Sequence, residues 1–161
     1  MTPNPQQQVE LPIMLISVSK KSARFTRIRI PRAPDTGIGT FFMRIDMTAM
    51  NQTIYVPTSI ASSKKPTGFV YRIEGTAEGA IVKADVSAQG DGIAQITVGT
   101  IVYTKIPAGM TASFRVLIDI KGRVPKSYQV VVHRINYKRN LNDTRYESLL
   151  QEIGSKILKF N

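Results

Sequence analysis

The sequence predicts an all-β protein: an antiparallel sandwich of eight or nine short strands, with an amphipathic helix at its C-terminus. Two observations predict the sandwich. Apolar and polar residues alternate along most of the chain, which is the period of a strand, and turn residues separate the alternating segments at intervals of roughly 8–12 residues. No helical pattern interrupts these segments, so parallel βαβ units are not expected. The predicted strands are residues 13–18, 25–30, 40–48, 53–56, 69–74, 80–86, 96–103, 114–121 and 128–137.

The segment 40–48 shows the alternation most clearly. Phe41, Met43, Ile45 and Met47 lie on one face of the predicted strand, while the other face is mostly polar. Because successive side chains of a strand point to opposite faces, the segment is expected to turn one face to a core and the other to solvent.

Glycine and proline mark the turns between the predicted strands. Residues 89–92 contain two glycines, which adopt positive φ without steric cost. Residues 106–109 combine a proline that pre-sets φ with a glycine that relaxes the bend, and residues 122–126 turn the chain before the last strong strand. Pro12 and Pro57 cannot donate to a ladder, so they mark a strand's start, edge or end.

The last residues change to a helical period. Six apolar side chains fall on one stripe of a helix: Tyr146, Leu149, Leu150, Ile153, Ile157 and Phe160. Thr144 and Glu147 fit the capping box at the start of a helix, and Gly154 weakens its middle by about 1 kcal/mol relative to alanine. A helix of this length is marginal alone, so we expect it to dock on its own sandwich or on a neighbouring subunit.

The chain is expected to form one globular domain with two distinct ends. Its 161 residues are the length of a single domain. We expect an N-terminal arm with an apolar strand at residues 1–18, a β-sandwich domain at 19–140 and a C-terminal helix at 141–161. The first eight residues lack the basic start and apolar middle of a signal peptide. No continuous apolar run reaches the roughly 18 residues of a transmembrane helix, so no membrane span is expected.

The composition excludes several classes of protein. Hydrophobic residues make up 42% of the chain and charged residues 20%, which is typical of a globular rather than a disordered protein. Cysteine is absent, which removes disulfides, thiolate metal sites and cysteine nucleophiles. The 22 basic and 11 acidic side chains give a net charge of +11. A field of this sign attracts polyanions, namely nucleic acid, an acidic protein neighbour or an anionic cell surface. The alternative interpretation is a solvated surface whose charges repel one another.

The sequence contains no motif for catalysis, a cofactor or a metal ion. The single histidine, His133, lies inside an apolar strand, whereas a zinc site needs three or four ligands. No serine lies in a Gly-x-Ser-x-Gly elbow, and no Gly-x-x-x-x-Gly-Lys phosphate loop occurs. Asp85 and Asp91 flank a turn but lack the number of oxygen ligands that calcium needs. We therefore expect a protein that is not an enzyme and that binds no cofactor and no metal.

Two clusters of basic residues are candidates for polyanion binding. The first contains Lys20, Lys21, Arg24, Arg27, Arg29 and Arg32, and the second contains Arg134, Lys138 and Arg139. Arg27 and Arg29 share one face of a predicted strand. Such a basic stripe is typical of an electrostatic footprint for a polyanion, and a solvated outer face produces the same pattern. Because Phe25 is the only ring in the first cluster, base stacking is not expected, and any nucleic-acid contact would be to phosphates.

Three stretches resemble a known kind of module. The residues "IPAGMTASFRVLIDIKG" at 106–122 and "YQVVVHRINY" at 128–137 are similar to the closing strands of immunoglobulin-like modules in bacterial surface and appendage proteins. In those modules a Pro-Ala-Gly turn precedes a Thr-x-x-Phe-x-Val strand, and the final strand ends near an Ile-Asn pair. The matching positions here are Pro107, Ala108, Gly109, Thr111, Phe114, Val116, Ile135 and Asn136.

Upstream, "GTFFMRIDMTAMNQTIYVP" at 39–57 is similar to the strand pair that opens the same modules. The resemblance covers about a third of the chain. It implies an immunoglobulin-like or jelly-roll-like sandwich with no active site. Similar sandwiches also serve as shell, decoration, neck and tail proteins of viruses.

These observations predict a non-enzymatic structural subunit of a symmetric assembly, either a virus particle or an extracellular or cell-surface filament. We expect it to contact copies of itself and other structural proteins through its two ends, with the arm adding as a strand to a neighbour's sheet. The candidate assembly contacts are Leu11, Ile13, Leu15, Tyr146, Leu149, Leu150, Ile153 and Ile157. The alternative is a β-sandwich module that binds a polyanion or nucleic acid through its basic strand faces.

Overall fold

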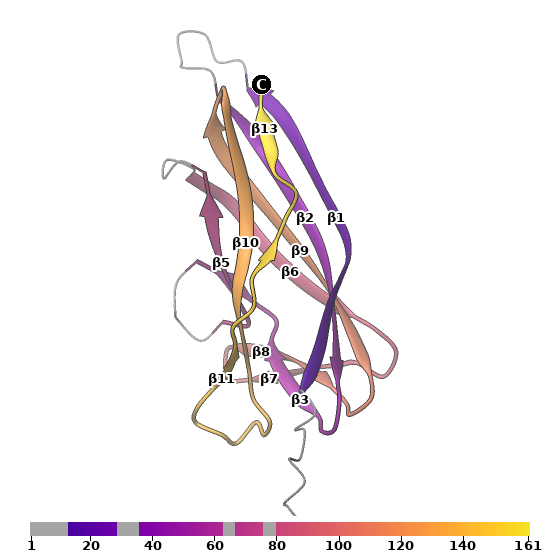
Figure 1. Cartoon of the computed structure of the whole chain (residues 1–161). Coiled ribbons are helices and arrows are strands. Elements are labelled where there is room, and N and C mark those ends of the chain that lie inside the picture. The colour runs from indigo at the N-terminus through magenta and orange to yellow at the C-terminus, as the bar shows by residue number, and fades with distance from the viewer. Residues whose placement is uncertain (1–12, 29–35, 63–66, 76–79) are drawn as a thin grey trace, which may run out of the picture.

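Every regular element that the structure describes is a strand. The computed structural model describes residues 13–28, 36–62, 67–75 and 80–161, and none of these residues is helical (Figure 1). Paired strands run antiparallel, except that β4 (Ile60–Ala61) pairs in parallel with β5 (Phe69–Glu74). The all-β, antiparallel character predicted from the sequence is confirmed.

The first sheet consists of four strands in the order β1-β2-β9-β6. Their bounds are β1 (Met14–Ile28), β2 (Thr36–Ala49), β9 (Thr111–Arg123) and β6 (Ala80–Gln89). Alternation in β2 and β9 buries Phe41 and Phe114 and exposes Arg44 and Arg115. The sheet therefore has an inner face in the core and an outer face toward solvent.

The remaining strands form two further sheets. The second sheet has the order β11 (Glu147–Leu149), β10 (Lys126–Tyr137), β5 and β4. Its strand β10 also pairs with β12 (Ile153–Gly154) and β13 (Leu158–Phe160). The third sheet has the order β3 (Ile54–Pro57), β8 (Ile101–Ile106) and β7 (Ala94–Val98).

The core lies between the first two sheets. Phe114 of β9 packs against Phe69 of β5, with the ring centroids 4.9 Å apart. Val130, Val132 and Ile135 of β10 are buried in the same cluster. Contact between the inner faces of two sheets is the arrangement of a β-sandwich.

Residues 14–18 and 25–28, which come from two predicted strands, belong to one continuous strand, β1. Residues 29 and 30 of the second predicted strand lie outside the described residues. β1 pairs with β2 along its whole length, apart from a bulge between Val18 and Lys20. The predicted boundary between arm and sandwich, after residue 18, therefore falls inside β1. The rest of the predicted arm, residues 1–12, lies outside the described residues.

The predicted strand 96–103 is two strands. β7 and β8 form a hairpin in which Val98 pairs with Ile101, and Gly99 between them has a φ of +64°. Glycine adopts this conformation without steric cost, so the chain reverses within two residues. Two predicted strands are joined in β1, whereas the division into β7 and β8, the short β4 and the three C-terminal strands add to the number. The described residues therefore form thirteen strands rather than eight or nine.

The predicted C-terminal helix is wrong. The segment instead follows β10 as three short strands, β11, β12 and β13. In a helix, Leu150 and Ile157 would share one buried stripe with Ile153. Here Leu150 is 70% exposed and Ile157 is 69% exposed, while Ile153 is buried. The open edge of β10 offers backbone hydrogen bonds to this segment, and tertiary pairing of this kind outweighs the local helical spacing.

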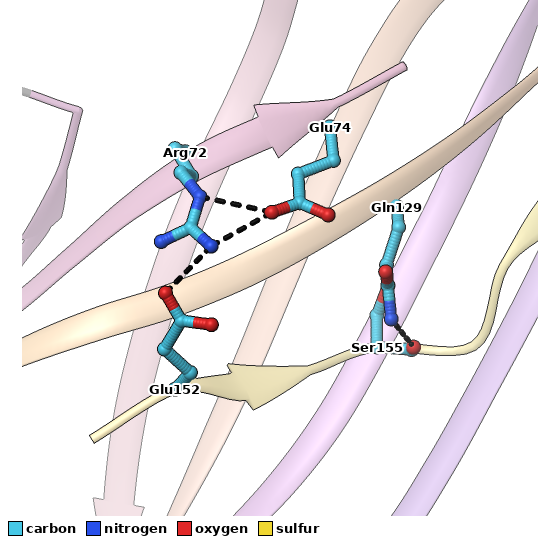
Figure 2. Close-up of polar contacts among 5 residues, drawn as sticks. All are labelled: Arg72, Glu74, Gln129, Glu152 and Ser155. Atoms are coloured by element: carbon cyan, nitrogen blue, oxygen red, sulfur yellow. Dashed lines mark hydrogen bonds and ion pairs between the residues drawn. The ribbon is translucent and has the colours of Figure 1, made fainter.

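Polar contacts hold the C-terminal segment on the second sheet (Figure 2). Ser155 donates its backbone N–H to the carbonyl of Val130 at 2.8 Å, and its Oγ accepts from the N–H of Val130 at 3.0 Å. Gln129 donates from Nε2 to the carbonyl of Ser155 at 2.8 Å. Arg72 of β5 reaches Glu152, just before β12, at 2.7 Å. These contacts hold the C-terminal segment against β10 and β5 of the same chain.

Phe160 closes one end of the sandwich. Its buried ring lies with its centroid 4.7 Å from that of Phe25 in β1 and 4.6 Å from that of Tyr128 in β10. Two glycines make room for the ring: a Cβ atom at Gly39 would lie 2.5 Å from it, and one at Gly122 would lie 2.7 Å from it. The C-terminal segment therefore packs against both main sheets, and β13 lies beside β1 and β10 (Figure 1).

Candidate polyanion-binding face

Three cations lie side by side on the outer face of the β1-β2-β9-β6 sheet. The register pairs Lys20 of β1 with Arg44 of β2, and Arg44 with Arg115 of β9. Directly opposed residues point to the same face of a sheet, and all three side chains are exposed. Neighbouring strands are about 4.8 Å apart, so the row spans about 10 Å at the backbone. We call these three residues the cation row.

The cation row has few partners within the chain. The Nζ of Lys20 lies 6.0 Å from the centroid of the Phe42 ring, and the Cζ of Arg115 lies 5.6 Å from it, both within range of attraction between a cation and a ring. Arg44 approaches Asp46, with 3.6 Å between Nε and Oδ1. Among the described residues, neither Lys20 nor Arg115 pairs with a carboxylate. Two of the three positive charges in the row therefore have no negative charge to balance them.

The rest of the outer face carries both signs of charge. Beside the cation row, the register places four more cationic side chains on this face: Arg24, Lys83, Lys121 and Arg123. The carboxylates that it places there, within the described ranges, are Asp46, Asp85 and Asp119. All three are engaged locally. Thr40 donates to Asp119 at 2.7 Å, and Lys83 lies 3.1 Å from Asp85. Asp46 accepts from the hydroxyl of Ser113 at 2.6 Å. Positive charge therefore exceeds negative charge over the face.

A hollow of about 380 Å³ lies next to the cation row. It is lined by residues of β2, β6 and β9, namely Phe42, Asp85, Val86, Ser87, Arg115 and Leu117. Phe42 and Leu117 are direct partners across β2 and β9 and supply apolar surface. Arg115 belongs to both the hollow and the cation row, and the Phe42 ring of the hollow lies within range of Lys20 and Arg115. The two features therefore form one continuous site.

The first predicted basic cluster is divided between two faces of β1. Lys20 and Arg24 lie on the outer face, whereas Lys21 and Arg27 lie on the opposite face, because successive residues of a strand alternate. The other two members of the predicted cluster, Arg29 and Arg32, lie outside the described residues.

The second predicted basic cluster lies on the second sheet and does not join the cation row. Arg134 of β10 is half-buried. Lys138 lies with its Nζ 4.6 Å from the centroid of the Tyr146 ring, and Arg139 binds Glu147 at 2.6 Å. Lys138 and Arg139 thus have partners within the chain.

Tyr146 also takes part in a polar contact with Tyr103. Their hydroxyl oxygens lie 2.6 Å apart, and Tyr103 is buried. Burial and this hydrogen bond raise the pKa of Tyr146 far above its usual range. The contact links β8 to the segment before β11.

The predicted assembly residues differ widely in exposure. Leu15 is 51% exposed and, like Leu150 and Ile157, presents an apolar side chain to solvent. The others described are buried or partly buried: Ile13, Tyr146, Leu149 and Ile153. Leu11 lies outside the described residues.

Of the cation row and the residues that line the hollow, sequence reasoning proposed only Lys20 for binding. It missed the ring of Phe42 and the cations Arg44 and Arg115. Strand alternation does indicate that each lies on the solvent side of its own strand. Alternation does not reveal that β1, β2 and β9 are neighbours in one sheet. Their pairing brings together residues that are far apart in the chain. The expectation of no base stacking considered Phe25 alone, and Phe42 places a ring within the site.

No protein-family model matches the chain, and no curated protein matches it in sequence. In the part of the chain that the structure describes, no three His, Asp or Glu side chains gather in a way that could hold a metal ion. No helix within the described ranges has the length and apolar character to cross a membrane.

Proposed function

We propose that the outer face of the β1-β2-β9-β6 sheet binds an extended polyanion. The observation that carries the proposal is the cation row, in which Lys20, Arg44 and Arg115 are directly opposed on three neighbouring strands. The net charge of +11 adds long-range attraction for the same class of ligand.

The cation row has an energetic cost that a bound anion would remove. Like charges directly opposite one another destabilise a sheet. At a separation of about 4–5 Å, two unit charges repel by about 1 kcal/mol in bulk water and by more near a protein surface. A phosphate or sulfate group on the row would replace this repulsion with charge-assisted hydrogen bonds. Arg44 and Arg115 suit such a group well, because a guanidinium can donate two parallel hydrogen bonds to it.

Salt-dependent binding tests the proposal. We expect fluorescence anisotropy with labelled oligothymidylate and labelled heparin fragments to show binding that weakens from about 50 to 200 mM salt. For a single-stranded nucleic acid, three phosphate contacts predict a slope of about −2 in a plot of log K against log salt concentration. Replacing Lys20, Arg44 or Arg115 with glutamine should flatten this slope by about 0.7 for each residue.

The matched control is Lys156→Gln. Lys156 is exposed and lies in the C-terminal segment beside the second sheet, so this substitution removes the same net charge from a different surface. It should leave the slope nearly unchanged. Equal effects of Lys156→Gln and Arg115→Gln would show attraction to overall charge rather than to this face and would refute the proposal.

A second candidate is a structural subunit that assembles with copies of itself. Leu15, Leu150 and Ile157 are exposed apolar side chains, and no described strand pairs with the second edge of β6. Exposed apolar groups and unpaired strand edges are features of surfaces that associate. On this proposal the chain is an immunoglobulin-like sandwich within a virus particle or an extracellular or cell-surface assembly.

Sedimentation velocity and electron microscopy of the full chain test the second candidate. Assembly should increase with concentration, and Leu150→Ser with Ile157→Ser should reduce it without unfolding the protein, because both side chains are exposed. A protein that stays monomeric at every concentration tested would contradict it.

A further inference from the structure

We propose that the hollow beside the cation row receives a base of a single-stranded nucleic acid whose phosphates lie along the row. This inference rests on the proposed polyanion binding and names the class of polyanion. It is motivated by the pairing of an apolar, ring-containing hollow with unbalanced cations on the same face.

The hollow has the size and lining of a site for one planar ring. Its volume of about 380 Å³ falls at the lower end of the range of about 300–1,000 Å³ for small-ligand sites. A base that enters it contacts the Phe42 ring and the Leu117 side chain. Aromatic side chains bind bases of any sequence because every base has a π-face.

Polar groups surround the apolar part of the hollow. The Asp85 carboxylate can accept a hydrogen bond from a ring N–H or an exocyclic amino group of a base, and Lys83 holds that carboxylate at 3.1 Å. The hydroxyl of Ser87 can donate or accept. Arg115 lines the hollow and also belongs to the cation row, so one side chain lies between the place for the base and the place for its phosphate.

The arrangement favours a single strand over the other polyanions. In a duplex the bases are stacked and paired, so a base must leave the helix before it can enter a hollow. A sulfated polysaccharide satisfies the cations but has no planar aromatic ring for Phe42. A flexible single strand can place phosphates on the row and turn one base toward β6.

The test compares three probes on the full chain at low salt by fluorescence anisotropy. The first is oligothymidylate, the second is an abasic oligomer with the same phosphate backbone, and the third is a duplex of the same length. We expect the wild-type protein to bind oligothymidylate about tenfold more tightly than the abasic oligomer, and more tightly than the duplex.

Substitutions at Phe42 show whether the preference comes from the hollow. Phe42→Leu keeps an apolar side chain but removes the ring, and it should abolish the preference for oligothymidylate over the abasic oligomer. Phe42→Tyr keeps the ring and should retain the preference. Thermal denaturation of both variants checks that the fold is intact, which is expected because Phe42 lies on the outer face.

The outcomes separate this inference from the proposal on which it rests. Equal binding of oligothymidylate and abasic oligomer would overturn the base site and leave polyanion binding standing. Tighter binding of the duplex, or a Phe42→Leu variant that keeps the preference for bases, would also overturn it. Absence of binding to all three probes and to heparin would overturn both.

Discussion

Removal of the Phe160 ring should destabilise the protein strongly, although Phe160 is the residue before the last. The ring is buried, with Phe25 and Tyr128 at centroid distances of 4.7 and 4.6 Å. Substitution to alanine would leave a cavity between β1, β10 and β13. The perturbation therefore tests whether the C-terminal segment lies in the sandwich as a strand.

The expected cost of Phe160→Ala is about 3–5 kcal/mol, which combines the lost burial of the ring with the cavity that remains. Domains of this kind are stable by about 5–15 kcal/mol in total. For a chain of this length, each kcal/mol lowers the melting temperature by about 2–4 °C, so a fall of about 6–20 °C is expected.

The assay is equilibrium denaturation of the full-length variants, followed by circular dichroism. Leu150→Ala and Ile157→Ala are the matched controls, because both side chains belong to the same apolar stripe of the predicted helix but are exposed in the structure. Each should change the free energy of unfolding by less than about 0.5 kcal/mol. Similar losses for Phe160→Ala and Ile157→Ala would refute the strand arrangement and restore the helix.

A second substitution checks the position of the ring independently. A Cβ atom at Gly39 would lie 2.5 Å from the Phe160 ring, so Gly39→Ala should destabilise the protein by about 1–3 kcal/mol. In the Phe160→Ala background the same change should cost much less. A double-mutant cycle should therefore give a coupling above about 0.5 kcal/mol, and strictly additive effects would place the ring elsewhere.

Three further predictions follow from other contacts. Arg115→Gln should raise the free energy of unfolding by a few tenths of a kcal/mol at low salt, because it relieves repulsion within the cation row. The gain should shrink as salt screens the charges. A variant that urea denaturation shows to be less stable than the wild type would contradict this. Ser155→Ala should cost about 1–3 kcal/mol, since it leaves the N–H of Val130 without its hydroxyl acceptor; an unchanged midpoint would speak against that contact. The pKa of Tyr146 is raised by burial and by its bond to Tyr103. The folded protein thus keeps a proton that the unfolded chain releases at its ordinary pKa of 10.0, so stability should be full below pH 10 and should fall as pH rises above it. Tyr146→Phe should make that alkaline fall shallower, and an identical slope in both proteins would refute the assignment.

Alternation in the sequence was sufficient to predict the buried residues of a strand that turns one face to the core. Segment 40–48 lies within β2, with Phe41, Met43, Ile45 and Met47 buried as expected. This pattern is local, because successive side chains of any strand point to opposite faces. It is therefore readable without knowledge of the neighbouring strands.

The C-terminal segment shows where a local pattern is insufficient. Its apolar spacing fits a helix, but the segment lies along the open edge of β10, where Ser155 exchanges hydrogen bonds with Val130. Short apolar runs do not distinguish helix from strand by period alone. The available edge decides between them, and only the tertiary structure contains that edge.

The sequence by itself determined the all-β class, the buried faces of the long strands and the excess of positive charge, because these depend on alternation and composition. The tertiary structure decided which charges act together. Lys20, Arg44 and Arg115 are separated in the chain and become neighbours only through the pairing of β1, β2 and β9. Strand order and register depend on contacts between distant residues, so no spacing within one strand could reveal the cation row or the hollow beside it.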